Sequence, residues 1–201
     1  FDLKFMAMFS IMFGAGIVLM SQHRDATKQP ILRVHYRRML LLLVFGLIHA
    51  YLIWYGDILV PYAICGLWVV WLRRWPARRL AIIGVIFILL GSVFHGFVGI
   101  VASTSEEVAD QVRGQYITAR EYHEAEIDAY LGSWSEHLPY RIEEALGLQL
   151  LIFPFMFFWR ISGLMFLGMA LFKWGVLNAA RSRAFYMRMA FIGGGLGIPL
   201  I

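Results

Sequence analysis

The side chains of this sequence that could do chemistry are a few ionisable groups placed inside or directly beside apolar segments. His49 and Asp57 lie in an almost charge-free run from Met39 to Leu72, and Arg38 precedes that run. Ionisable groups inside hydrocarbon are costly and usually functional. An imidazole can take or give a proton near neutral pH, which suits general acid–base catalysis. His49 and Asp57 are therefore the candidate catalytic residues.

Both residues also have simpler interpretations, which the sequence leaves open. His49 could hydrogen-bond a neighbouring helix, and Asp57 could cap a helix that begins at Ile58. On one helix the two residues would be about 80° apart around the axis, loosely on one side. This spacing permits a relayed contact between His49 and Asp57 but does not imply a direct one.

Three further residues are candidates for substrate binding. Arg38 could grip phosphates at the cytoplasmic surface, or serve only as a membrane anchor. His95 is predicted at a depth close to that of His49, so the two could bracket a substrate or ligate a b-type haem from facing helices. Arg160 keeps its charge well inside an apolar segment, so it must face protein, water or an anion.

Membrane-spanning helices are needed to position these residues. The chain of 201 residues is 60% hydrophobic and only 15% charged, far from the globular mean. A helix needs about 20 residues to cross the hydrocarbon. The sequence predicts an all-α, polytopic transmembrane helical bundle of about six helices in one domain. Its apolar segments cover residues 5–21, 39–56, 58–72, 80–102, 145–172 and 189–201.

Charge alternation between these segments predicts the topology. Residues 22–38, 73–79 and 173–188 are basic, whereas 103–144 carries ten acidic and three basic residues. Because Lys and Arg concentrate on the cytoplasmic side, the basic stretches should be cytoplasmic and 103–144 an extracytoplasmic polar loop. The rule also requires 145–172 to cross once, as a long helix bent at Pro154. Two short helices, 145–158 and 161–175, are the alternative.

Composition also limits the kinds of binding partner that we expect. The formal net charge is +5, but most basic residues form short clusters between apolar segments, which indicates lipid headgroups rather than nucleic acid. The single cysteine, Cys65, excludes a disulfide framework and a thiolate metal cluster. We expect a lipid bilayer as the main partner, with partner subunits or a homo-oligomer as further options. We also expect a fragment of a longer protein, because the first residue is Phe and the last segment stops abruptly.

Three strings resemble the YeiB-like family of bacterial polytopic membrane proteins. They are FSIMFGAGIVL (9–19), RRMLLLLVFGLIHAYLIWYGDILVPYAICGL (37–67) and GLMFLGMALFKWGVL (163–177). The middle string is the most specific, with a double arginine, then Gly-Leu-x-His, then Trp-x-Gly-Asp-Ile-Leu. The resemblance implies a multi-pass protein of the bacterial inner membrane, with further helices before Phe1 and after Ile201.

That family is similar, remotely, to membrane acyltransferases such as the acyltransferase-3 enzymes and the heparan-α-glucosaminide N-acetyltransferases. The similarity implies a membrane-embedded histidine that passes an acyl group from cytoplasmic acyl-CoA to an acceptor on the other side. Acyltransferase-3 proteins show an arginine, ten residues and then this histidine, and Arg38 and His49 have that spacing.

The leading hypothesis is therefore an acyltransferase-like protein. In it His49 is the general base that activates an acceptor hydroxyl or amine, Asp57 tunes it, and Arg38 lies near the phosphates of acyl-CoA as co-substrate. The first alternative is a non-catalytic membrane subunit or a ligand-binding or transport protein. The second is a bis-histidine haem protein with His49 and His95 as ligands.

Overall fold

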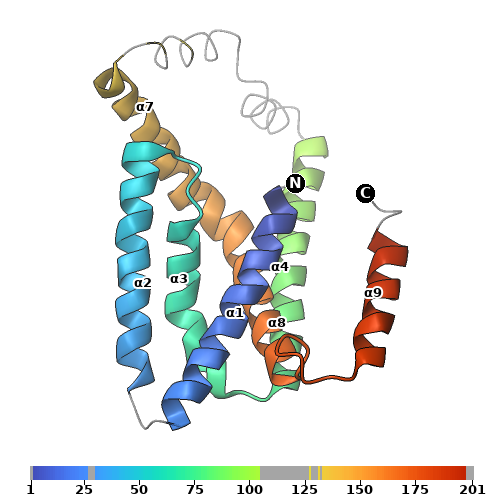
Figure 1. The fold of residues 1–201 in the computed structure, drawn as a ribbon. Coiled ribbons are helices and arrows are strands. Elements are labelled where there is room, and N and C mark those ends of the chain that lie inside the picture. The colour runs from blue at the N-terminus through green and yellow to red at the C-terminus, as the bar shows by residue number, and fades with distance from the viewer. Residues whose placement is uncertain (1, 27–29, 105–126, 128–130, 132, 198–201) are drawn as a thin grey trace.

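The structure is a computed structural model of the chain, and it describes residues 2–26, 30–104, 127, 131 and 133–197. The regular elements in these residues are helices, joined into six continuous helical segments (Figure 1). The predicted all-α fold is confirmed. Most of the polar loop, 105–126, 128–130 and 132, lies outside the described residues, as do 198–201 of the last predicted segment.

The helices differ in length and type. Two of them contain π-helical turns, which are uncommon and often occur at functional sites. In chain order the elements are α1 (Asp2–Ala26), α2 (Ile31–Ile48) with the π turn η1 (His49–Ile53), α3 (Leu59–Val69) with the 3₁₀ turn η2 (Val70–Arg74), α4 (Ala77–Thr104), α7 (Trp134–Gly147), the π-helix η3 (Leu148–Phe157), α8 (Phe158–Lys173) and α9 (Arg183–Gly197).

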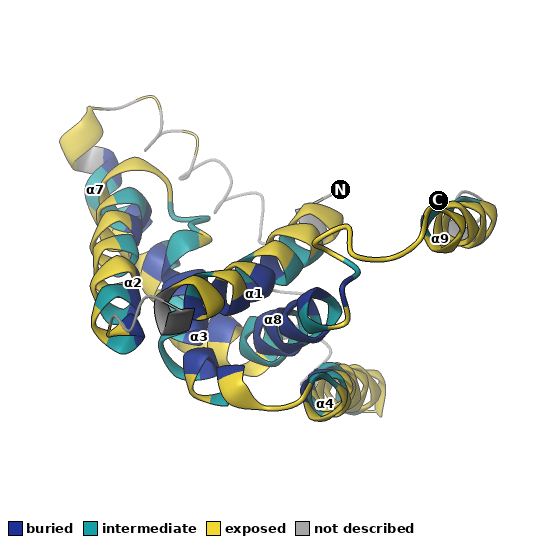
Figure 2. Cartoon of the chain, turned by 60° about the horizontal axis from the view of Figure 1, so that its bottom comes forward, coloured by how far each residue is buried: buried dark blue, intermediate teal, exposed yellow. Residues whose placement is uncertain are grey.

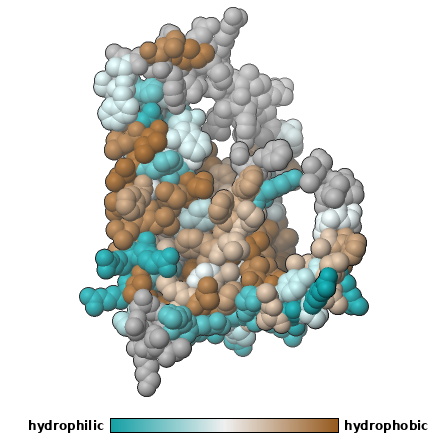
Figure 3. Space-filling view, viewed as in Figure 1, coloured by the Kyte–Doolittle hydropathy of each residue, from teal (hydrophilic) through white to brown (hydrophobic). Residues whose placement is uncertain are grey.

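Four helices in the described residues are long and apolar enough to cross a membrane: Lys4–His23, Ile31–Ile53, Ala77–Val101 and His137–Lys173. The molecule is thus a multi-pass membrane protein. Its surface agrees, since Figure 3 shows a broad apolar band over α2 and hydrophilic residues gathered along the lower edge of the same face.

Two predicted spans correspond to shorter helices. α3 and η2 together cover Leu59–Arg74, about 24 Å of helix, and run antiparallel beside α2 (Figure 1). The segment is short because it begins after the turn at Asp57 and ends just before Pro76, which cannot continue a helix. α9 stands apart from the other helices (Figures 1 and 2). Membrane crossing by 58–72 and 189–201 stays a prediction.

The helix from His137 to Lys173 is continuous and does not reverse near 159–162. At 37 residues, about 55 Å, it is much longer than the hydrocarbon is thick, and Figure 1 shows it running diagonally across the bundle. Pro154 lies inside η3, where the backbone shifts to π-type bonding. The helix starts earlier than expected, because residues 134–144, predicted as part of the loop, form most of α7.

α8 is the centre of the bundle, enclosed by α1, α3 and α4, and carries the densest set of buried residues (Figure 2). Glycines let the backbones approach closely, as is common where lipid supplies no hydrophobic drive. A Cβ on Gly84 of α4 would lie 2.8 Å from the Gly163 carbonyl oxygen, and a Cβ on Gly168 would collide with the Ile11 backbone. A Cβ on Gly96 would meet no described atom within 4 Å.

Candidate functional site

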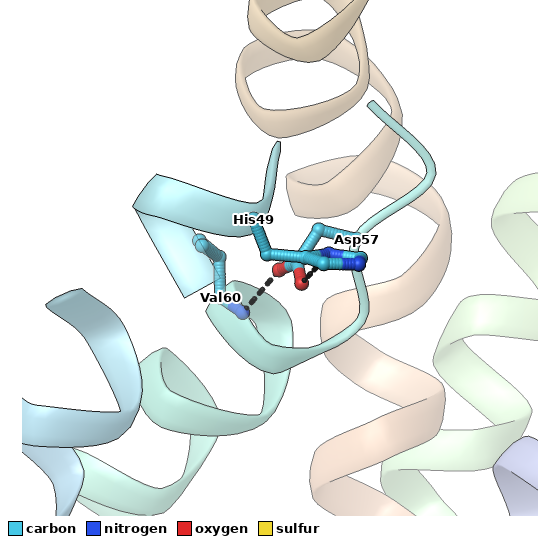
Figure 4. Close-up of polar contacts among 3 residues, drawn as sticks. All are labelled: His49, Asp57 and Val60. Carbon is cyan, nitrogen blue, oxygen red and sulfur yellow. Dashed lines mark hydrogen bonds and ion pairs between the residues drawn. The ribbon is translucent and has the colours of Figure 1, made fainter. Parts of the chain in front are cut away.

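His49 and Asp57 form a direct hydrogen-bonded pair, closer than their spacing on a regular helix would allow (Figure 4). Nδ1 of His49 lies 2.9 Å from Oδ1 of Asp57. The Asp57 side chain is 1% exposed, whereas that of His49 is 33% exposed. The carboxylate is thus held away from solvent while the imidazole stays accessible.

Local chain geometry explains the pairing. The N–H of Trp54 donates to the carbonyl of His49, 2.8 Å away, which closes the π turn η1. The chain then folds back through Tyr55 and Gly56, and a Cβ on Gly56 would lie 2.5 Å from the Trp54 ring. The Trp54 ring also packs edge-to-face on His49. A turn with this close approach needs glycine, and it brings Asp57 back to His49.

Asp57 has a second role. Its Oδ2 accepts a hydrogen bond from the N–H of Val60, 2.7 Å away, in the first turn of α3 (Figure 4). Such caps satisfy helix N–H groups that lack partners inside the helix. Capping and the contact with His49 were alternatives at the sequence level, and one carboxylate does both.

α7 and η3 hold the π turn from a distant part of the chain. Nη1 of Arg141 donates to the carbonyl of Leu52, 2.6 Å away, and Nε1 of Trp134 donates to the same carbonyl at 3.3 Å. The Tyr51 hydroxyl donates to Oε1 of Gln149 at 3.2 Å. Arg141 is 7% exposed, so this charged hydrogen bond is shielded.

Arg141 is predicted from the sequence only as one of the three bases of the polar loop, not as a residue of the site. The available signal was the spacing of Trp134, His137 and Arg141, which places one aromatic and two basic side chains on one helix face. His137 and Arg141 are both buried, with 3.2 Å between Nδ1 and Nη2. Hydropathy alone does not reveal a polar face that is buried.

The His49–Asp57 geometry selects one form of the imidazole. When Asp57 is ionised it only accepts hydrogen bonds, so Nδ1 of His49 carries the proton, and in the neutral form of the ring Nε2 keeps its lone pair. This is the arrangement in which a carboxylate orients a histidine for general base catalysis. No metal is needed for it, and the described residues contain no group of three His, Cys, Asp or Glu side chains that could hold one.

Asp57 lines a cavity of about 220 Å³ between α3 and the long helix, together with Tyr55 and Gln149. Two of its apolar lining residues, Ile58 and Tyr62, also line a second, almost wholly apolar cavity of about 440 Å³ between α1 and α2. The two cavities therefore adjoin each other at Ile58 and Tyr62.

Arg38 lines a third cavity, which lies on the other side of the apolar one from Asp57. This third cavity has a volume of about 590 Å³ and is also lined by His23, His35 and Met20, and Phe13 is common to it and the apolar one. Arg38 is exposed, and its Nη1 lies 3.3 Å from Sδ of Met20. Arg38 and His49 are eleven residues apart on α2 and η1, about 16 Å. The structure does not bring them into contact, and of the two only Arg38 lines one of these three cavities.

His95 and Arg160 share a separate cavity of about 670 Å³, bounded by α1, α4, η3 and α8. His95 is exposed and its Nδ1 lies 2.6 Å from the Gly91 carbonyl oxygen, while Arg160 is half-buried. Neither residue lines the cavities next to Asp57 or Arg38. The five candidate residues therefore fall into three groups, with only His49 and Asp57 in direct contact.

The haem hypothesis does not fit this geometry. His49 extends from α2, and His95 lies on α4, on the other side of α1 and α8 (Figures 1 and 2). Each ring already has a partner on its own side of the bundle, Asp57 for His49 and the Gly91 carbonyl for His95. One iron cannot take both imidazoles as axial ligands in this arrangement.

Two known proteins are similar to this chain. It is 38% identical over 90 residues to the uncharacterized protein YxaH of Bacillus subtilis (strain 168), covering 45% of this chain and 22% of YxaH. It is 28% identical over 202 residues to the uncharacterized protein YeiB of Escherichia coli (strain K12), covering 99% of this chain and 49% of YeiB.

The chain thus spans about half the length of YeiB and less of YxaH. No family model matches the sequence, and no solved structure matches it. The resemblance to YeiB-like proteins predicted from the three sequence strings is confirmed. Over nearly the whole of its own length, the chain is a homologue of the uncharacterized bacterial protein YeiB.

Proposed function

We propose that this chain is part of an acyltransferase of the bacterial inner membrane, which passes an acyl group from cytoplasmic acyl-CoA to an extracytoplasmic acceptor. The observation that carries the proposal is the His49–Asp57 pair, with 2.9 Å between Nδ1 and Oδ1 and a buried carboxylate. A carboxylate fixed at both oxygens orients the imidazole and stabilises its protonated form.

In the proposed reaction, Nε2 of His49 takes the proton of the acceptor hydroxyl or amine. The acceptor oxygen or nitrogen forms a bond to the acyl carbon, and the bond from that carbon to the CoA sulfur breaks. The proton on His49 then passes to the sulfur, which leaves as the CoA thiol. Asp57 stays ionised throughout and keeps Nδ1 protonated.

The cavities between Arg38 and Asp57 support a route for the donor. Arg38 would bind phosphates of CoA at the basic end of α2, where the guanidinium matches oxyanions. The pantetheine arm and acyl group would then extend along the apolar cavity lined by Leu42 and Phe13. His95 and Arg160 take no part in this route, because their cavity is a different one.

The test is release of the CoA thiol by the purified protein in nanodiscs, with acetyl-CoA and palmitoyl-CoA as donors and glucosamine or water as acceptor. We expect release by the wild type and a loss of about a hundredfold or more in His49→Gln. Arg183→Gln is the control, because Arg183 is exposed at the start of α9 and takes no part in holding the π turn.

The alternative hypothesis, a non-catalytic subunit or transport protein, predicts a different effect of His49→Gln. In that case His49→Gln would lower the melting temperature and leave thiol release at the wild-type rate. An equal rate in both proteins would therefore overturn the acyltransferase proposal.

A further inference from the structure

The cavity that contains His95 and Arg160 is a second polar site, separate from the proposed acyl-transfer site. It has three polar side chains, Ser92, His95 and Arg160, and its remaining walls are apolar or small. The Ser92 hydroxyl donates to the carbonyl of Ile88, 2.9 Å away, so the ionisable groups are His95 and Arg160. The positive charge at this site is permanent, because a guanidinium does not lose its proton in a protein.

Arg160 needs a counter-charge. Within the described residues, neither its cavity nor its hydrogen bonds and ion pairs supply a carboxylate. A cationic side chain at membrane depth without a partner is strongly disfavoured, and such residues pair or mark a ligand site. The cavity has room for a ligand, about 670 Å³. An anion that enters this cavity would supply the missing counter-charge.

The tautomer of His95 narrows the class of anion. The Gly91 carbonyl only accepts, so Nδ1 of His95, 2.6 Å away, carries the proton. In the neutral form of the ring, Nε2 has a lone pair and accepts a hydrogen bond. A ligand with both an anionic oxygen and an O–H group satisfies Arg160 and His95 together. A singly protonated phosphate monoester has both, whereas an ionised carboxylate has no O–H to offer.

The apolar lining of the cavity and the depth of Arg160 in the membrane indicate that the rest of the ligand is a hydrocarbon chain. Ile88, Met156 and Leu164 would contact a hydrocarbon chain. Arg160 lies 13 residues before Lys173, about 20 Å from the basic end of its helix, which leaves about 10 Å to the opposite face of the hydrocarbon. We propose that this cavity binds an amphiphilic phosphate monoester, with its phosphate on Arg160 and His95 and its chain along α4 and α8.

The experiment is calorimetric titration of the purified protein in nanodiscs of zwitterionic lipid, with empty nanodiscs as the blank. The probes are dodecyl phosphate, laurate, dodecanol and inorganic phosphate. We expect dodecyl phosphate to bind best, and Arg160→Gln to weaken it about 10- to 100-fold, the range for losing a charged hydrogen bond. Arg160→Lys keeps the charge without the two-pronged geometry and should give a smaller loss.

The matched control is Arg79→Gln, which removes the same charge from the exposed first turn of α4, outside the cavity. It should leave binding unchanged. If Arg160→Gln fails to fold, Ala7→Phe tests the site with Arg160 intact, because Ala7 lines the cavity and a phenyl group would occupy it. We expect Ala7→Phe to abolish binding of dodecyl phosphate.

Other outcomes would overturn the inference. Equal binding of dodecanol would show an apolar groove without headgroup recognition. Binding of inorganic phosphate as tight as that of dodecyl phosphate would show a free-anion site. Absence of binding in the wild type would show that an internal or partner carboxylate neutralises Arg160. Binding by His49→Gln should match the wild type, so this test is independent of the proposed acyl transfer.

Discussion

The Leu52 carbonyl oxygen lies 2.6 Å from Nη1 of Arg141, so a helix almost ninety residues further along the chain holds the π turn that carries His49. A carbonyl at the end of a helix lacks a partner inside that helix. Arg141 supplies one, and the position of the imidazole thereby depends on α7.

Arg141→Gln should lower kcat about tenfold and leave KM for acyl-CoA nearly unchanged, because Arg141 positions the π turn and lies far from Arg38. Arg141→Lys should restore part of kcat, since an ammonium can still donate to the Leu52 carbonyl. Steady-state kinetics check both. The control is Arg183→Gln, an exposed arginine at the start of α9. A rise in KM with constant kcat would contradict the positioning role.

Asp57→Asn and Asp57→Ala should separate the two roles of this side chain. The amide oxygen of Asn can still accept from the Val60 N–H, so Asp57→Asn should keep the melting temperature close to that of the wild type. The NH₂ group of the introduced Asn would face Nδ1 of His49 and would favour the tautomer with the proton on Nε2, which cannot act as the base. Thiol release should therefore fall at least a hundredfold. Asp57→Ala should lose both the activity and about 1 kcal/mol of stability. Wild-type activity in Asp57→Asn would disprove the tautomer argument.

His49→Ala and Arg38→Ala should impair the enzyme in different ways. Loss of a general base lowers kcat by about a hundredfold or more, so His49→Ala should act on turnover. Arg38→Ala should mainly raise KM for acyl-CoA, because its guanidinium would bind the phosphates. Initial rates over a range of acyl-CoA concentrations distinguish the effects. A pure KM effect in His49→Ala would refute its role as a base.

Gly168→Ala should destabilise the bundle by about 1 to 3 kcal/mol, the usual cost of overpacking, because the new methyl group would collide with the Ile11 backbone. Gly96→Ala is the matched control, since a Cβ there meets no described atom within 4 Å. Thermal unfolding in one detergent compares the two variants. Equal melting temperatures would show that α1 and α8 are not in close contact.

Arg78→Cys and Leu131→Cys should report opposite sides of the membrane. Arg78 lies in the basic stretch 73–79, and Leu131, 80% exposed, lies in the polar loop. In intact cells an impermeant maleimide should label Leu131→Cys and leave Arg78→Cys unlabelled. The native Cys65 is buried and should not react. Labelling of Arg78→Cys alone would reverse the predicted orientation.

The sequence by itself determined the class of the protein and its helical architecture. Transfer of apolar residues from water to hydrocarbon is a sum over local segments, so hydropathy reveals the long helices without knowledge of their packing. The sequence also identified His49 and Arg160 as unusual, because a histidine or an arginine inside an apolar run is exceptional in whichever direction its side chain points. The resemblance to YeiB-like proteins likewise depends on local strings, chiefly residues 37–67.

Only the tertiary structure decided which of these residues meet. An ideal helix places His49 and Asp57 about 80° apart around its axis, and they touch because a π turn and the turn at Gly56 reverse the chain between them. Arg141 supports that turn from α7, and Arg160 lies with His95 because α4 and α8 pack closely at Gly84 and Gly163. Contacts of this kind depend on the rotation and crossing of whole helices, to which per-residue transfer free energies are insensitive.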